Sequence, residues 1–151
     1  MNARRLVQGL FAGVALFALP AALPAQTVVG VQNLDFGSVI PGVPTTVAPT
    51  DAVRAGQFRI SGVFIRNVTV SFVLPTVMNG PLGATMPITF ANTDGGYSTF
   101  LQGNTPFNPH TPYNETVVFN ATIVLGGRVN PTPTQRGGAY SANIVITVIF
   151  L

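Results

Sequence analysis

Hydrophobic and polar residues alternate with a period of two along much of the chain, and short apolar runs lie between clusters of Gly, Pro and Asn. A period of two indicates strands, whereas an amphipathic helix needs apolar residues at i, i+3, i+4 and i+7. From residue 26 onward no stretch keeps the helical spacing. The pattern therefore predicts an all-β fold. The expected strands are 28–36, 45–48, 57–63, 68–74, 86–91, 98–101, 115–125 and 140–151.

Turn-forming residues separate these strands and support the same interpretation. Short strands at this spacing are typical of a sandwich of two sheets. No linker divides the chain, so we expect a single β-sandwich domain over residues 26–151. The separators are Ile40-Pro41-Gly42, Asn79-Gly80-Pro81, Asp94-Gly95-Gly96, Gly126-Gly127 and Gly137-Gly138.

The terminal segment 142–151 is strongly β-prone and carries no charged side chain. A strand of this kind is an aggregation hazard on an open sheet edge, so something must cover it. The sequence allows the cover to be another strand of the same chain or a strand from a partner. One face of the segment is entirely apolar and consists of Ala142, Ile144, Ile146, Val148 and Phe150.

Residues 1–25 have the pattern of a secretory signal peptide. Arg4 and Arg5 precede the apolar stretch 10–19, and small residues follow as far as Ala25. The apolar stretch is shorter than the about 20 residues that a membrane-spanning helix needs. We therefore expect residues 1–25 to be removed on export, and we expect no membrane span in the mature chain.

Composition narrows the range of functions. Charged residues make up only 7% of the chain, which has no cysteine and one histidine. The net charge of +3 includes Arg4 and Arg5 of the leader, and the arginines that remain are scattered. Scattered arginines are a poor footprint for nucleic acid, and we expect no such partner. Without disulfides, stability must come from burial and strand pairing.

The reactive side chains are too few to indicate an enzyme. His110, between Pro109 and Thr111, is the only plausible general base or metal ligand. A catalytic site needs partners held in a set geometry, and the chain has neither a Gly-x-Ser-x-Gly motif nor a cluster of His, Asp and Glu with metal-ligand spacing. We expect an exposed loop at His110, and neither a catalytic residue, a metal nor a cofactor.

The segment 92–114 is rich in Gly, Pro, Asn and Thr and has little strand pattern beyond 98–101. Such a segment is either a plain surface connection or a binding loop carried on a rigid sandwich. If it binds a ligand, the residues to test are Tyr97, Phe107 and Tyr113.

Several short motifs are shared with one family of secreted proteins. Gly138 is fourteenth from the C-terminus and Phe150 is next to last. The other motifs are Leu34-Asp35-Phe36-Gly37, Phe58-Arg59-Ile60-Ser61-Gly62, Val70-Ser71-Phe72-Val73-Leu74-Pro75, Leu125-Gly126-Gly127 and Gly138-Ala139-Tyr140-Ser141. In these features the chain resembles bacterial pilin-like subunits of the chaperone–usher type and their spore-coat-protein-U-like relatives.

The resemblance implies an immunoglobulin-like two-sheet sandwich that lacks its final strand and has an apolar groove beside its C-terminal strand. It implies that a periplasmic chaperone fills this groove, with an outer-membrane usher as a further partner, until a neighbouring subunit donates its N-terminal extension. Such head-to-tail contacts propagate into a filament. The assembly face would then be the apolar face of 142–150, and the protein would pass through the periplasm to the cell surface or the extracellular space.

The extension available for donation is short. A donor strand needs about five alternating side chains, or about ten residues, and only Gln26–Asn33 precede Leu34. Within it, Val29 and Val31 are apolar and correctly spaced. Three alternatives follow: cleavage occurs earlier, the region 34–36 is itself partly donated, or the subunit accepts a strand without giving one.

The predicted function is thus a non-enzymatic structural subunit that joins its neighbours by strand complementation in a surface fibre or coat. The alternative is a self-contained secreted adhesin or binding module that uses the segment 92–114.

Overall fold

The computed structural model describes residues 26–62, 64–99 and 101–151. The predicted signal peptide, 1–25, lies outside the described residues. The chain is all-β, as predicted, and its sheets pack as a sandwich. In chain order the strands are β1 (Thr27–Gln32), β2 (Thr45–Val47), β3 (Gly56–Ser61), β4 (Arg66–Val73), β5 (Val77–Asn79), β6 (Thr85–Thr89), β7 (Gly95–Thr99), β8 (Thr105–Phe107), β9 (Tyr113–Val117), β10 (Ala121–Leu125), β11 (Gly127–Val129) and β12 (Val145–Phe150).

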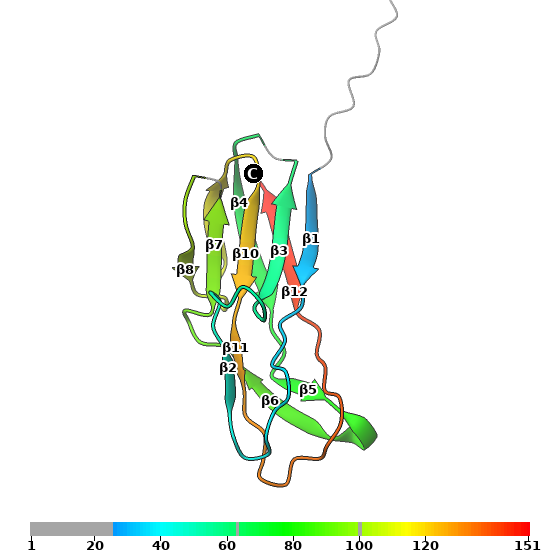
Figure 1. Cartoon of the computed structure of the whole chain (residues 1–151). Helices are drawn as coiled ribbons and strands as arrows, with labels where there is room; N and C mark the ends of the chain where they lie inside the picture. The colour runs from blue at the N-terminus through cyan, green and yellow to red at the C-terminus, as the bar shows by residue number, and fades with distance from the viewer. Residues whose placement is uncertain (1–25, 63, 100) are drawn as a thin grey trace, which may run out of the picture.

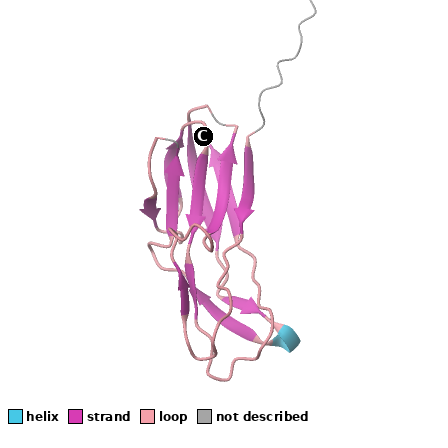
Figure 2. Ribbon diagram, in the orientation of Figure 1, coloured by secondary structure: helices cyan, strands magenta, loops and turns pink. Residues whose placement is uncertain are grey.

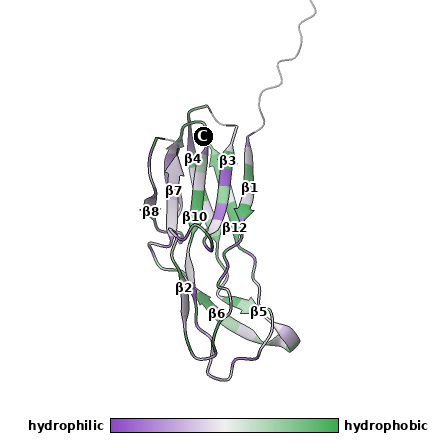
Figure 3. Cartoon of the chain, viewed as in Figure 1, coloured by the Kyte–Doolittle hydropathy of each residue, from purple (hydrophilic) through white to green (hydrophobic). Residues whose placement is uncertain are grey.

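The upper tier of the molecule in Figure 1 consists of two facing antiparallel sheets. One has five strands in the order β1-β3-β10-β7-β8, and the other has three in the order β12-β4-β9. Hydrophobic and hydrophilic residues alternate along β3, as Figure 3 shows, and its Phe58 and Ile60 pack in the core between the two sheets. Ile60 and Ile123 of one sheet meet Val68, Val70 and Val117 of the other in a single buried core.

The lower tier is a smaller four-stranded sheet in the order β2-β11-β6-β5 (Figure 2). It has its own core, in which Phe36 packs with Val47, Met86, Ile88 and Val129. A short 3-10 turn, η1 (Pro81–Gly83), joins β5 to β6. No helix among the described residues is long and apolar enough to cross a membrane.

The two tiers are joined by β10 and β11, which follow each other almost without interruption. Only Gly126 separates β10 in the upper tier from β11 in the lower tier. A Cβ atom at Gly126 would lie 2.5 Å from the carbonyl oxygen of Val47, so the close approach of β2 requires glycine here. The pair Gly126-Gly127 therefore joins two strands and is not the turn that the sequence predicted.

Three further strand predictions need correction. The predicted strand 115–125 is two strands, because β9 belongs to the three-stranded sheet and β10 to the five-stranded one. The chain turns between the sheets at 118–120, where Phe119 has a φ of 66°. The predicted strand 140–151 begins only at Val145, since Ser141 pairs with Asn79 beside the lower tier. The segment 92–114 contains β7, β8 and the start of β9 and is not one long loop.

Candidate functional site

The C-terminal strand β12 lies at the edge of its sheet, and among the described residues it has a strand on one side only. It pairs antiparallel with β4, from Val145 opposite Val73 to Phe150 opposite Val68. Leu151 continues this register, and its N–H donates to the carbonyl oxygen of Asn67 at 2.9 Å.

The bond from Leu151 also tells which backbone groups of β12 are free. Opposite residues of an antiparallel pair alternate between hydrogen-bonded and non-hydrogen-bonded positions. Thr147 and Ile149 therefore bond to β4, as Leu151 does. The N–H and C=O groups of Ile146, Val148 and Phe150 point away from β4 to the free edge.

The residues with free backbone groups also carry the inward-facing side chains of β12. Ile146, Val148 and Phe150 are half-buried and pack against the core of the upper tier. Ala142 and Ile144, which precede the strand, are also half-buried and line a cavity beside it. The structure thus brings all five predicted assembly residues to one side of the molecule.

The strand β1 is the edge of the five-stranded sheet on the same side of the sandwich as β12, and we call this side of the sandwich the open seam (Figure 1). Its wall includes Val28 of β1 and the rings of Phe58 and Phe72, which meet edge to face with centroids 5.8 Å apart. A side chain is missing at Gly30, opposite Phe58, where a Cβ atom would meet no atom within 4 Å.

A cavity of about 560 Å³ occupies the lower part of the open seam. It lies between the end of β1 and the segment that leads into β12. The seam therefore combines a free backbone edge, an apolar wall and unfilled space, which are the three properties that an added strand requires. Among its lining residues are Gly30, Gln32, Leu34, Phe58, Tyr140 and Ile144.

The opposite side of the sandwich, between β8 and β9, is closed. The chain itself connects these two edges, and the rings of Phe107 and Tyr113 stack there with centroids 4.4 Å apart. Tyr97 packs beside Tyr113, and its hydroxyl donates to the carbonyl oxygen of Thr116 at 3.1 Å. The two sides of one sandwich therefore differ, because stacked rings fill the core between β8 and β9, whereas a cavity lies beside the segment that leads into β12.

The environment of two tyrosines on the closed side favours their neutral form. Burial, together with the negative charge of Glu115, raises the pKa of Tyr97 to about 12. Burial and the hydrogen bond from its hydroxyl to Glu115 Oε2, at 2.9 Å, likewise raise the pKa of Tyr113 to about 12. These hydroxyls hold the core closed and are not poised for acid–base chemistry at neutral pH.

The same geometry corrects the predicted ligand residues. Tyr97 is 0% exposed and Phe107 is 7% exposed, so neither side chain is on a surface that a ligand can reach. Tyr113 is half-buried. Their sequence neighbours are turn-forming residues, which suggested a loop, but β7 and β8 carry Tyr97 and Phe107 into the core.

The candidate donor residues lie within the five-stranded sheet. Val29 of β1 is opposite Arg59 of β3, and Val29 and Val31 both point to the outer face, where each is about half exposed. To be donated, β1 would have to leave β3. The donor role of Val29 and Val31 stays a prediction.

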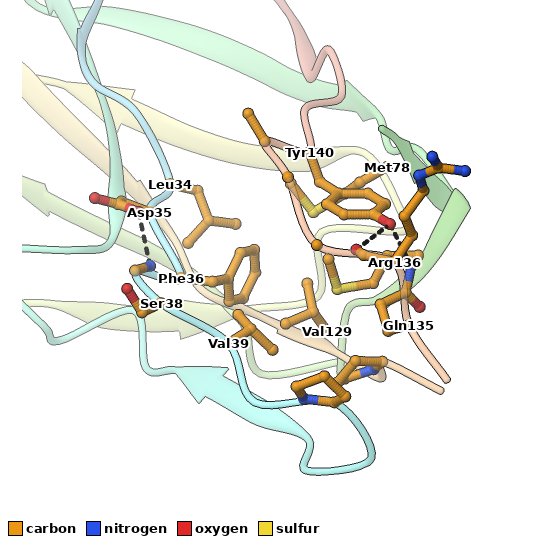
Figure 4. A pocket seen from close by; sticks show the side chains of 17 residues that line it. Leu34, Asp35, Phe36, Ser38, Val39, Met78, Val129, Gln135, Arg136 and Tyr140 are labelled. Carbon is orange, nitrogen blue, oxygen red and sulfur yellow. Dashed lines mark hydrogen bonds between the residues drawn. The ribbon is translucent and has the colours of Figure 1, made fainter. Parts of the chain in front are cut away.

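A second cavity, of about 520 Å³, lies in the lower tier beneath the seam (Figure 4). Leu34, Phe36 and Met78 give it an apolar lining, and Leu34 and Met78 also line the seam cavity. Its polar groups bond to each other: Gln135 Nε2 donates to the Tyr140 hydroxyl at 2.6 Å, and that hydroxyl donates to the carbonyl oxygen of Arg136 at 2.8 Å. This cavity therefore extends the apolar wall of the seam downwards.

His110 lies in the exposed connection between β8 and β9. Its Nε2 is 2.8 Å from the carbonyl oxygen of Phe90, and because a carbonyl only accepts, this nitrogen donates. Its backbone N–H donates to Asn108 Oδ1 at 3.0 Å. Within the described residues no three His, Asp or Glu side chains are grouped as a metal site requires. The visible role of His110 is to tie this connection to the end of β6.

Sequence reasoning missed part of the seam. Val28, Phe58 and Phe72 belong to predicted strands, but alternation along one strand does not tell which strands are neighbours. The unfilled space beside Gly30 could not be predicted from the sequence either, because a glycine in a strand has several possible structural roles.

Comparison with known protein families assigns the chain to a family. The model of a family described as a domain of unknown function, DUF4402, matches residues 42–150, which include every strand except β1. A search of curated proteins gave no match. Since the match spans more than half of the sequence, the chain belongs to the DUF4402 family.

Proposed function

We propose that the chain is an exported, non-enzymatic structural subunit, and that it joins neighbouring subunits by accepting a β-strand at the free edge of β12. Repetition of this contact would build a surface fibre or coat. The residues that support this proposal are those of the open seam.

The observation that carries the proposal is the coincidence of two properties at Ile146, Val148 and Phe150. Their backbone groups point to the free edge, and their side chains form a half-buried apolar face. An added strand would satisfy the backbone groups and cover the apolar face at once, as in other cases of strand addition. Until then the edge is a hazard, so a periplasmic chaperone that covers β12 during export is part of the proposal.

The alternative of a self-contained binding module finds little support in the aromatic residues of the segment 92–114. Tyr97 and Phe107 serve the core, and Tyr113 stacks on Phe107 at the closed side.

The direct test is a denaturing gel of the cell-surface fraction, run with and without boiling and probed for this chain. A strand bonded along a full edge and seated in an apolar groove is slow to leave, so we expect a ladder at multiples of the subunit mass that collapses on boiling. A monomer band in both lanes would contradict assembly by strand addition.

Two proline variants assign the contact to the free edge. In Val148→Pro the lost N–H points away from β4, so the ladder to β4 stays intact, and proline is tolerated at such edge positions. We expect this variant to fold, as judged by circular dichroism, and to lose the gel ladder. In the matched control Ile149→Pro the lost N–H bonds to β4, so the fold itself should be destabilised.

Charge variants test the apolar face in the same way. Ile146→Asp places a carboxylate in the seam, whereas Ile149→Asp places it on the outer face of the same strand, where Ile149 is about half exposed. Only the first should abolish assembly. Normal ladders from both Val148→Pro and Ile146→Asp would rule out β12 as the accepting edge.

A further inference from the structure

The core and the open seam explain only half of the motif Phe58-Arg59-Ile60-Ser61-Gly62. Phe58 and Ile60 pack between the sheets, so alternation along β3 turns Arg59 and Ser61 to the outer face of the five-stranded sheet. There they line a hollow of about 440 Å³, which we call the arginine hollow. All of its lining side chains can donate a hydrogen bond. The other lining residues are Ser98, Thr99, Asn120 and Thr122.

The strand register brings three of these side chains into one row. Arg59 of β3 is opposite Thr122 of β10, and Thr122 is opposite Ser98 of β7. Opposite residues of antiparallel strands lie on the same face of the sheet, with Cβ atoms about 4.5–5.5 Å apart. The three strands therefore hold a guanidinium group beside two hydroxyl groups.

The arginine hollow carries a positive charge that the described part of the chain does not neutralise. The one ion pair among the described residues joins Arg54 to Asp51, so no carboxylate there bonds to the exposed guanidinium of Arg59. None of the four acidic residues of the sequence lines the hollow. A guanidinium forms paired, charge-assisted hydrogen bonds to two oxygens of one anion. The charge and the donors of the hollow thus match an oxyanion.

The surroundings of Arg59 favour an oxyanion that is attached to a sugar. Serine and threonine hydroxyls both donate and accept hydrogen bonds, as the hydroxyls of a sugar do. On its other side Arg59 is opposite Val29 of β1, which is 49% exposed and offers an apolar surface to the C–H groups of a sugar ring. A bare inorganic anion would not use this apolar surface.

We propose that the arginine hollow binds an acidic saccharide, whose carboxylate bonds to Arg59 and whose hydroxyls bond to Ser98 and Thr122. The hollow lies over β3, β10 and β7, so a strand accepted at β12 leaves it uncovered. The site is complete in one copy of the chain and does not depend on the strand addition proposed above. Copies repeated along a fibre would bind one polysaccharide through many hollows and gain avidity.

Nuclear magnetic resonance of the purified protein, titrated with glucuronic acid at neutral pH, tests the site. Low salt is used because salt screens the attraction of an exposed arginine. We expect the backbone amide signals of Arg59, Ser61 and Thr122 to shift and to saturate together. Glucose lacks the carboxylate and sulfate lacks the sugar ring, so each should bind at least about ten-fold more weakly than glucuronic acid.

Three variants separate a built site from general attraction between arginines and anions. Arg59→Gln keeps a long polar side chain at an exposed position, so it should fold and raise the Kd for glucuronic acid about ten-fold. The matched control is Arg128→Gln, because Arg128 is also exposed and lies between two threonines, Thr46 and Thr89. This control should bind as the original chain does.

The third variant, Thr122→Val, keeps the charge and the shape of the arginine hollow and removes one hydroxyl. Valine is favoured in strands, so the variant should fold. We expect it to raise the Kd about five-fold, as the loss of one hydrogen bond would.

Four results would overturn the proposal. Binding of glucose as tight as that of glucuronic acid would remove the role of the charge, and binding of sulfate as tight would remove the saccharide. An equal loss in Arg59→Gln and Arg128→Gln would reduce the effect to general attraction of anions. An unchanged Kd in Thr122→Val would leave a lone arginine in place of a site.

Discussion

At the scale of single residues, the aromatic side chains of the segment 92–114 show how burial changes a role. Tyr97, Phe107 and Tyr113 stand among turn-forming residues in the sequence, and the structure uses them to close one side of the sandwich. Local composition predicted a connection here, whereas the segment forms β7, β8 and the start of β9. It did not reveal burial, which depends on the sheet packed opposite them.

The two buried tyrosines give a prediction for alkaline pH. Their pKa values are raised from 10.0 to about 12, so the folded state favours the neutral phenols. The stability that this provides is complete below pH 10 and is lost as the pH rises through about 12. In an absorbance titration of tyrosinate, we expect Tyr97 and Tyr113 to ionise late and together with unfolding.

The control for this titration is the same protein in concentrated urea, where the pKa values of Tyr97 and Tyr113 should return to the usual tyrosine value of 10.0. If Tyr97 and Tyr113 titrated near pH 10 in the folded protein, the closed side of the sandwich would be open to water.

At the scale of elements, β12 predicts an alternating pattern of hydrogen exchange. The amides of Thr147, Ile149 and Leu151 bond to β4, whereas those of Ile146, Val148 and Phe150 face the free edge. In the monomer we expect slow exchange in the first set and fast exchange in the second, because only bonded amides are protected. Nuclear magnetic resonance of the exchanging monomer measures each amide separately.

Assembly should remove this alternation. If a strand is added along β12, the amides of Ile146, Val148 and Phe150 become protected as well. Uniform protection of β12 in the monomer would mean that the edge is already covered, and uniform exposure would mean that β12 does not pair stably with β4.

The position of β12 at an edge could not be predicted from its own sequence. Alternation predicted its apolar face correctly, because that pattern depends only on neighbouring residues of one strand. The pairing of β12 with β4 joins distant parts of the chain, and the alternation within one strand does not indicate which strand will be its partner. The predicted strand was also too long, since Ser141 pairs with Asn79 outside the sandwich.

At the scale of the whole molecule, the two tiers should unfold as one unit. They have separate cores, one around Ile123 and one around Met86, but Gly126 alone separates the strands that run between them. We expect Ile123→Ala and Met86→Ala each to lower the free energy of unfolding by about 2–5 kcal/mol.

Urea unfolding followed by circular dichroism and by tyrosine fluorescence tests this unity. Both probes should report one transition with the same midpoint for the original chain and for each variant. Two transitions, of which Met86→Ala shifts only one, would show that the tiers are independent domains.

The open seam also belongs to this scale. The sequence predicted an apolar terminal strand. That this strand lies beside a cavity on the same side of the molecule as β1 follows from the order of strands in the sheets.

The sequence by itself determined that the chain is all-β, where most strands lie and which face of the terminal segment is apolar. These properties follow from a period of two and from turn chemistry, both of which act within a few residues. The tertiary structure alone decided that β12 is an edge strand and that Tyr97 and Phe107 are core residues. These properties arise from pairing between strands far apart in the chain, for which local alternation carries no information.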